Sequence, residues 1–556
     1  MTDRNRVLVL GGGVGGMTAA HELAERGFHV TVLDARDLPG GKARSMPATG
    51  TGTPVAPGEP PRPDLPAEHG FRFFPGFYVH VPDTMRRIPF GSNPNGVLDN
   101  LRGSTRALIA RMDGPPIVTP ARFPRSLADL RLLGRSMFGS HLGLTARDSL
   151  HFTGRLLRLL TSCEERRYEQ WEHESWWTFS GAAARSDAFQ KYLAIGLTRT
   201  LVAAQAQRIS ARTGGYILLQ LLIDTLDPSE VVDRVLDGPT NDRWIDPWMA
   251  HLRSLGVDYR SNVTVQAIDF DGQVVTGVDY TDDHGPGHLD ADWYVAAMPV
   301  EVFAPLVTDA MRAAEPLLGG LGQMETRWMN GVLYYLRTDL PIVHGHAIYI
   351  DSPWALTSIS QPQFWQAIDL STMGNGEVQG VLSVDVSDWT TTGLCIEKPA
   401  LQCTKEEVIH EVWEQLKRHL NVDGAVVLRD EDVVTAFVDT DIEFSNPHPT
   451  INLEPLLINT AGSWDLRPEA NSAIENLFLA SDYVRTYTDL ATMEGANEAA
   501  RRAVNGILDT IGSGAERCRI WPLHEPAVFA PFRAIDGWWY RRTRGRRTRG
   551  RRTPGA

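Results

Sequence analysis

The sequence has few cysteines and no long apolar run, and each shortage excludes a class of protein. Its 556 residues include only four cysteines, none in a Cys-x-x-Cys pair, which argues against a disulfide framework and against a structural metal. The longest apolar runs, such as Tyr216–Ile223 with Gln220 inside, are much shorter than a bilayer span. No charged and apolar leader precedes the first strand-like segment, Arg6–Leu10. We therefore expect a cytoplasmic protein without a transmembrane helix.

Positive charge is scarce outside the C-terminal end. The formal net charge is −14, although eight arginines and no acids lie between Arg541 and Arg552, so the rest of the chain carries −22. An acidic body argues against nucleic acid as a partner, because phosphate contacts need a basic face. The arginines follow Trp538–Tyr540, and this combination is typical of peripheral contact with a membrane. The alternative is a low-complexity end, and we expect a C-terminal extension over residues 513–556 with a basic, disordered tail.

A glycine-rich turn near the N-terminus carries the strongest motif. Gly11, Gly13 and Gly16 occupy the positions of a Gly-x-Gly-x-x-Gly sequence, with Gly15 in the same turn, directly after an apolar strand and directly before a helical pattern. Such a turn lets the backbone approach a pyrophosphate at the start of a helix. Asp34 follows Gly16 by 18 residues, close to the spacing of an acid that binds a ribose 2′-hydroxyl. These features predict a dinucleotide site.

A second glycine bend with a cation follows the acid at Gly40–Arg44. On this bend and the first turn, the chain resembles the FAD-dependent amine oxidase and phytoene desaturase superfamily. Lys42 stands where that superfamily has an arginine, so it keeps the positive charge but lacks the planar guanidinium group. The resemblance implies that Gly41 and Lys42 approach the diphosphate or ribityl part of FAD. Further segments match the superfamily in chain order, namely Glu68–Arg72, Val265–Ile268, Asn476–Asp482 and Met493–Ala496.

The resemblance also implies a role for each of these segments. Gly70–Phe71 belongs to the part that approaches the flavin ring, and Val265–Ile268 lies in a strand and matches the segment whose backbone meets the adenine. Asp482 is expected at the ribityl or diphosphate part, and Met493–Glu494 starts a helix that faces the pyrimidine carbonyls of the flavin. A helix N-terminus stabilises negative charge on a reduced ring. His69 and Arg72, in the flavin-facing segment, are the candidate catalytic residues for proton handling or ring polarisation.

The order of the elements and the resemblance together predict the fold class. We expect an α/β protein with a discontinuous, Rossmann-like FAD-binding domain and an inserted mixed α+β substrate domain. The FAD-binding domain is expected to comprise 1–90, 237–300 and 460–512, and the substrate domain 91–236 and 301–459. Within 91–236 the pattern is mainly helical, as in Ser126–Leu133 and Asp148–Leu160, whereas Val257–Val295 alternates and predicts a small antiparallel sheet.

One complete dinucleotide fingerprint predicts FAD as the sole dinucleotide. No cysteine directly precedes Asp482, which argues against a covalent tether, and His344 with His346 lacks a third metal ligand nearby. The resemblance implies an oxidoreductase that transfers hydride from a small hydrophobic substrate to the flavin, favouring a phytoene desaturase-like isoprenoid or carotenoid dehydrogenase. A flavin amine oxidase acting on primary or secondary amines is the alternative, and a flavin-binding protein without turnover is a third. The sequence leaves the electron acceptor open, with oxygen and a quinone as the two candidates.

Overall fold

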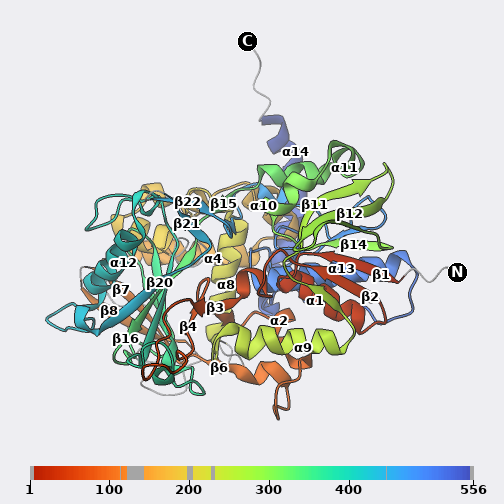
Figure 1. Cartoon of the computed structure of the whole chain (residues 1–556). Coiled ribbons are helices and arrows are strands. Elements are labelled where there is room, and N and C mark those ends of the chain that lie inside the picture. Colours follow the sequence, from red (N-terminus) through yellow and green to blue (C-terminus); the bar gives the residue numbers. More distant parts are fainter. Residues whose placement is uncertain are drawn as a thin grey trace.

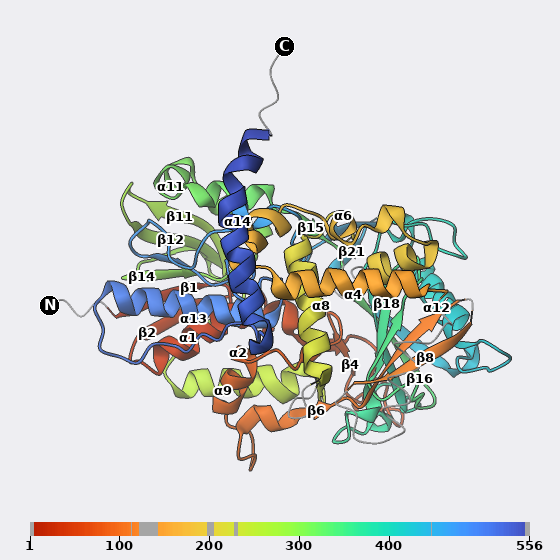
Figure 2. The same cartoon turned by 180° about the vertical axis from the view of Figure 1, so that it is seen from behind.

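The computed structural model of the chain describes residues 5–112, 114–121, 143–196, 205–226, 232–445 and 448–550. Two large β-sheets lie at opposite ends of the molecule in Figure 1, with helices between them and across them. The reverse view in Figure 2 shows the same separation of the two sheets. The space where the two sheets face each other therefore lies near the middle of the molecule.

The first sheet is parallel and combines three distant parts of the sequence. Its central strands are short, apolar and almost completely buried, as a sheet covered on both faces requires. All neighbouring strands pair in parallel, so their carboxyl ends share one edge. In sheet order the strands are β10 (Asp258–Arg260), β2 (His29–Leu33), β1 (Arg6–Leu10), β14 (Trp293–Ala296) and β24 (Leu477–Leu479). The predicted α/β class is confirmed.

Helices cover one face of the parallel sheet, and a smaller sheet lies beyond the other face. Figures 1 and 2 both show β11 and β12 on the side of the parallel sheet away from α9. The small antiparallel sheet agrees with the alternating pattern of this segment and consists of β11 (Thr264–Phe270), β12 (Val275–Asp282) and β13 (Gly285–Leu289). The helices pack against one another in the pairs α1–α13, α1–α9 and α2–α13. They are α1 (Val14–Ala24), α2 (His80–Arg87), α9 (Asp246–Ser254) and α13 (Met493–Thr510).

The second sheet has seven strands and is mainly antiparallel. Its two central strands, β16 and β19, are buried at every position. Helix α12 (Lys405–Leu420) covers it, and its N-terminus has a capping box between Thr404 and Glu407. In sheet order the strands are β20 (Val433–Val438), β16 (Asn330–Leu336), β19 (Gly380–Val386), β18 (Leu356–Ser360), β17 (His346–Tyr349), β7 (Arg106–Arg111) and β8 (Gly114–Pro120).

The prediction that 91–236 is mainly helical was wrong for its first part. Residues 106–111 form β7 and residues 114–120 form β8, because β7 pairs in parallel with β17 and extends the second sheet. This long-range pairing leaves no periodic signal in the local sequence. The expected helix at 148–160 is present as α4 (Ala146–Thr161), whereas Ser126–Leu133 lies outside the described residues. Further helices in this region are α5 (Glu164–Arg166), α6 (Trp176–Ser180) and α8 (Ala211–Leu226).

The C-terminal extension is more ordered than its composition indicates. Helix α14 (Ala530–Gly550) packs against α4 and α5 on the outside of the molecule, as Figure 2 shows. Asp536 anchors it by accepting hydrogen bonds from Arg166 at 2.8 and 2.9 Å. The expectation of a disordered tail was therefore wrong as far as Gly550. No helix in the described part of the chain is both long and apolar enough to span a bilayer.

Short elements join the larger ones. Two short helices, α10 and α11, follow β14, and several two- and three-stranded sheets fix the connecting loops. The helices are α10 (Val300–Phe303) and α11 (Asp309–Ala314). The strands are β3 (Ser45–Ala48), β4 (Leu65–Glu68), β5 (Phe74–Pro75), β6 (Leu101–Gly103), β9 (Asp233–Leu236), β15 (Thr326–Arg327), β21 (Ile442–Phe444), β22 (Pro449–Asn452) and β23 (Leu456–Leu457).

Candidate active site

A cavity of about 630 Å³ lies at the carboxyl edge of the parallel sheet and reaches the second sheet. Its walls come from the glycine turn, the segment after β4, the start of β11, and the segment between β24 and α13. Most of the predicted cofactor and catalytic residues line it together, namely Gly11, Gly13, Gly15, Asp34, Gly41, Lys42, His69, Gly70, Phe71, Arg72, Val265, Asp482 and Met493. Gly16 and Glu494 are not among the lining residues.

The glycine turn needs three of its glycines for close backbone contacts. Gly11 has a φ of +105°, in the left-handed region that favours glycine. A Cβ on Gly15 would lie 2.0 Å from the carbonyl oxygen of Ala480, and one on Gly16 would lie 1.8 Å from that of Gly11. Gly16 therefore allows α1 to pack closely against the glycine turn, and it does not line the cavity.

Gly13 differs from its neighbours because the space beside it is open. A Cβ built there would meet only the Cα of Gly41, at 3.7 Å. Gly13 is also the N-cap of α1 and no side chain caps the helix, so its first N–H groups are directed at the cavity end. A helix start with free N–H groups and room for a ligand is a ready site for a phosphate group.

Asp34 closes the side of the cavity at the end of β2. Its Oδ1 accepts a hydrogen bond from the Arg36 backbone N–H at 3.0 Å, and its Oδ2 accepts one from the Tyr259 hydroxyl at 2.7 Å. Burial raises the pKa of this carboxyl. The Tyr259 oxygen also lies 3.1 Å from the Gly12 carbonyl oxygen, so it ties the acid to the glycine turn. The sequence reading missed Tyr259, which no motif marks.

The cation of the second glycine bend is held by an acid from the far side of the cavity. Lys42 Nζ donates to Glu301 Oε1 at 2.8 Å and to the Pro455 carbonyl oxygen. Burial tends to lower the Lys42 pKa, but Glu301 and nearby Asp482 outweigh it and raise the pKa. Lys42 therefore stays charged and sits where a diphosphate or a ring carbonyl could meet it.

A buried network of ion pairs joins the first part of the chain to the second sheet. Arg36 pairs with Asp441 at 3.0 Å and with Glu454 at 2.8 Å, and Arg44 contacts the same two acids. All four side chains are largely shielded from solvent. The loops after β2 and β20 are thereby fixed to each other at the cavity wall, since breaking one such pair leaves a buried charge.

His69 belongs to this network. Its Nδ1 lies 2.6 Å from Asp439 Oδ2 and 3.4 Å from Asp441 Oδ2. Burial alone would lower the His69 pKa, but the nearby carboxylates of Asp439 and Asp441 raise it to about 9. His69 is thus a cation at neutral pH, and it offers the cavity a positive charge rather than a proton-accepting nitrogen.

Arg72 extends from the same segment into the cavity wall. Its guanidinium donates to the Lys42 carbonyl oxygen, and within the described residues its Nε has no hydrogen-bond partner. Burial lowers its pKa, which Glu68 and Asp385 oppose. A buried donor without a protein partner beside a cavity is the kind of group that a ligand carbonyl or anion satisfies.

The closing segment between β24 and α13 is held from behind. Arg467 is 1% exposed and donates to the carbonyl oxygens of Asp482 and Tyr483 and to the carboxylate of Asp489. Asp489 has a positive φ of 43° and also bonds Arg212. This buried network fixes the path of the chain into α13, and a strained backbone of this kind persists only where its surroundings enforce it.

Met493 and Glu494, which both begin α13, face different ways. Met493 lines the cavity, where Thr492 caps the helix and leaves its remaining N–H groups facing the ligand space. The Glu494 side chain turns away and accepts hydrogen bonds from the backbone N–H groups of Val79, His80 and Val81 at 2.7 to 2.9 Å. Its carboxylate therefore caps α2, and only its backbone belongs to the helix end at the cavity.

A second, smaller cavity adjoins the first and is almost entirely apolar. It measures about 140 Å³ and shares several lining residues with the larger cavity. These shared residues are Phe73, Tyr78, Met329, Leu456, Ala491 and Thr492. None of the described residues that line the smaller cavity carries a charged side chain. The two cavities meet beside the start of α13, so a ligand in one could contact a ligand in the other.

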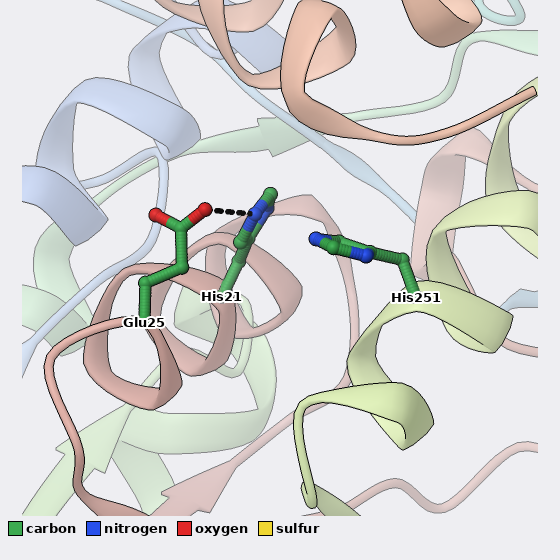
Figure 3. Close-up of side chains that lie close together, drawn as sticks. All are labelled: His21, Glu25 and His251. Carbon is green, nitrogen blue, oxygen red and sulfur yellow. Dashed lines mark hydrogen bonds and ion pairs between the residues drawn. The ribbon is translucent and has the colours of Figure 1, made fainter.

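Three groups of described residues bring together side chains that could hold a metal ion, and Figure 3 shows one of them. His21 and Glu25 lie one turn apart on α1, and His251 approaches from α9. His21 Nε2 lies 3.0 Å from Glu25 Oε1, and His21 Nδ1 accepts from Trp248 Nε1 at 3.2 Å. An indole nitrogen only donates, so Nδ1 must hold the lone pair and Nε2 the proton. The nitrogen that faces Glu25 is therefore not free for a metal.

The comparison with protein families agrees with this geometry. The model of the family described as "flavin containing amine oxidoreductase" matches residues 14–508, which is most of the chain. The chain belongs to this family. It is therefore a flavin enzyme of the oxidoreductase class, as the glycine turn and the closing segment predict.

Two curated relatives share a short, similar segment with this family member. The chain is 48% identical over 50 residues to hydroxyneurosporene desaturase from Rhodobacter capsulatus, which is 9% of this chain and 10% of that protein. It is 45% identical over 49 residues to a neurosporene-forming phytoene desaturase from Cereibacter sphaeroides, again 9% and 10% of the two chains. The matches therefore span about a tenth of the relatives' length.

Solved structures of amine oxidases share the fold along almost the whole chain. Putrescine oxidase bound to putrescine has a TM-score of 0.60 at 12% identity, covering 91% of this chain and 99% of that one. Cyclohexylamine oxidase from Brevibacterium oxydans has a TM-score of 0.58 at 13% identity, covering 92% and 100%. At this identity the likeness establishes the architecture of the family and not the substrate.

The charge on His69 can be tested through stability. His69→Gln should lower the melting temperature most below pH 6.5 and progressively less as the pH rises through about 9. The reason is that a raised folded-state pKa adds stability below the unfolded pKa and loses it above the folded one, here about 3 kcal/mol for this shift. Differential scanning calorimetry of both proteins from pH 6 to 10 measures the difference, and a constant difference would contradict the ion pair.

Proposed function

We propose that this enzyme binds FAD without a covalent bond and oxidises a hydrophobic substrate by accepting hydride on the flavin. One observation carries the proposal, namely the uncharged, apolar cavity that shares part of its wall with the larger one beside the start of α13. An apolar site next to a redox cofactor suits a substrate whose reacting group is a C–H bond. FAD supplies the hydride chemistry, and the protein supplies position and exclusion of water.

The residues of the larger cavity fit FAD from one end to the other. Asp34 would hold the adenosine ribose, and the open backbone at Gly13 would receive the diphosphate at the start of α1. Lys42 would add positive charge near the diphosphate or ribityl part. At the other end, Arg72 has a buried donor without a protein partner, and the N–H groups at the start of α13 would face the ring carbonyls.

Gly13 gives a direct test of the FAD proposal. Gly13→Ala should leave the fold intact, since its Cβ would meet nothing closer than 3.7 Å and its φ of −73° suits alanine. The same methyl group would occupy space expected to hold the diphosphate, so we expect FAD affinity to fall at least about tenfold. Equilibrium titration of the apoprotein with FAD, followed by flavin fluorescence, measures the affinity.

Gly154→Ala is the matched control, because Gly154 lies in the exposed face of α4 with open space around it. This variant should keep its FAD affinity, and its melting temperature should be equal or slightly higher because alanine favours a helix interior. If Gly13→Ala bound FAD as tightly as the unaltered protein, the diphosphate would have to lie elsewhere in the cavity.

We favour an isoprenoid or carotenoid substrate over an amine. The local similarity is to two carotenoid desaturases, and the smaller cavity offers no charged side chain to an ammonium group. The amine alternative is supported by the family description and by the overall likeness to two amine oxidases. A protein without turnover would not need the apolar cavity. Oxygen or a quinone is the proposed acceptor for the electrons that the flavin collects.

Anaerobic bleaching of the flavin separates the two substrate classes. We expect linear isoprenoids to reduce the bound flavin, seen as loss of its visible absorption, and primary and secondary amines to leave it oxidised. Bleaching by amines alone would show that the substrate is an amine and that the protein is an amine oxidase. Bleaching by neither class would reject both proposals.

We also propose that α14 contacts an anionic membrane surface, from which a hydrophobic substrate would be taken. Its large apolar side chains are more exposed than is usual, at 55% for Phe532, 58% for Ile535, 46% for Trp538 and 56% for Trp539. The arginine-rich sequence follows them directly. Exposed indoles beside basic side chains suit a headgroup layer, and each basic residue near an anionic surface adds about 1 kcal/mol.

Sedimentation with lipid vesicles tests this contact. The protein should bind phosphatidylserine-containing vesicles at low salt, and Trp538→Ala with Trp539→Ala should weaken binding about tenfold because two interfacial anchors are lost. Val426→Ala, another exposed apolar position at 59%, is the control and should bind like the unaltered protein. Equal binding by the double variant and the control would mean that α14 is not the docking element.

A further inference from the structure

We propose that Asp385 takes up the proton that leaves the substrate during oxidation. This inference rests on the proposed hydride transfer and adds a catalytic residue to it. No sequence motif marks Asp385, which is the second-last residue of the fully buried strand β19. A carboxyl group at the centre of a seven-stranded sheet needs a physical reason, because such positions are otherwise filled by apolar side chains.

The position of Asp385 in the sheet directs its side chain at the cavity. Asp385 pairs with Gly331 of β16, and paired residues of antiparallel strands point to the same face. On that face a Cβ at Gly331 would lie 2.9 Å from the His69 carbonyl oxygen, and a Cβ at Gly70 would lie 2.7 Å from Asp385 Oδ1. The carboxyl group therefore lies against the backbone of the segment expected at the flavin ring, and it lines the larger cavity.

The Asp385 carboxyl group has fewer hydrogen-bond partners than its buried oxygens can accept. Asp385 is 5% exposed, and within the described part of the chain its Oδ1 has no hydrogen-bond partner. The charged or titratable groups that face it are Arg72, His69 and His346, and the Phe71 backbone N–H also acts to lower its pKa. Burial raises its pKa to about 7, although these positive groups oppose the rise. A group that is half ionised near neutral pH can both accept and release a proton.

The other titratable groups around the cavity are less suited to this role. His69 already holds its proton below about pH 9 because of Asp439. Glu454 is paired with Arg36, and Glu68 accepts hydrogen bonds from the backbone N–H and hydroxyl of Thr240. Among these acids, Asp385 is the one that has an unpartnered oxygen and lies near its point of half ionisation.

The step balances without a further reactant. A hydride leaves one substrate carbon for the flavin, which is the oxidant, and a proton leaves the adjacent carbon for the Asp385 carboxylate. The electron pair of the second C–H bond forms the new C=C bond. The carboxyl group then returns its proton to water once the product has left, which restores the carboxylate.

Anaerobic flavin reduction by the isoprenoid found to bleach the holoenzyme tests this role. In the unaltered protein the rate should rise with pH through a midpoint near 7, as the carboxylate forms. Asp385→Asn keeps the shape and should slow reduction by about 10² to 10⁴-fold and abolish the midpoint, whereas Asp385→Glu should retain a pH midpoint. FAD affinity, measured by fluorescence titration, should stay within about threefold in both variants.

Two further measurements separate catalysis from folding. Ser383→Ala alters a buried hydroxyl two residues earlier on the same strand, which does not line the cavity, and should reduce the flavin at the normal rate. Asp385→Asn should melt at or above the temperature of the unaltered protein, and the excess should be larger at pH 8 than at pH 5. The sign follows because a folded-state pKa raised above 3.8 lowers the stability of the unaltered protein progressively up to about pH 7, and by a constant amount above it.

The outcomes are distinct. An Asp385→Asn protein that bleaches at the normal rate with the normal pH profile would overturn the role of Asp385 and leave the proposed function standing. An unaltered protein that no isoprenoid and no amine can bleach would overturn the proposed function, and the role of Asp385 with it.

Discussion

The structure depends on one close approach of backbone to backbone. Gly15 at the start of α1 meets the carbonyl of Ala480 at the end of β24, where a Cβ would lie only 2.0 Å from that oxygen. This contact joins the first and last segments of the chain, and it sets α1 and α13 side by side with both N-termini at the same edge of the parallel sheet. Two helix starts that face one cavity provide a site for negative charge at each end of a long ligand.

A second constraint holds the cavity closed from the other side. The ion pairs of Arg36, Arg44 and His69 with Asp439, Asp441 and Glu454 connect loops of the parallel-sheet part to loops of the second sheet. With His69 protonated, three positive and three negative charges balance, so no net charge is buried there. The proposed flavin site and the apolar cavity thereby keep a fixed relation, which the proposed hydride transfer over a short distance would require.

The sequence predicts the parts of the site that depend on local backbone geometry. Gly11, Gly13, Gly15 and Asp34 could be recognised because a tight turn, a helix start and a strand end leave a fixed spacing in the sequence. The lining of the cavity contains nearly all the residues predicted for it. Glu494 lay in a correctly predicted helix start, but its side chain turns to α2, because helix position alone does not decide which neighbour a side chain meets.

Other features could not be predicted, because they arise from pairing between distant segments. Tyr259 and Asp385 reach the site only through the register of their strands with β2 and β16. Strand β7 likewise forms because it pairs with β17, and β8 then pairs with β7. The composition of the C-terminal extension pointed to irregular structure, whereas α14 is stabilised by packing on α4 and α5 and by the bonds of Asp536 to Arg166.

A crystal structure of the holoenzyme would test the central claim most directly. The account predicts the diphosphate beside Gly13 at the start of α1, and the flavin ring between Phe71 and the start of α13 with one face open to the apolar cavity. A flavin ring that lies outside this cavity, or whose open face is covered by protein with no path to the apolar cavity, would contradict it.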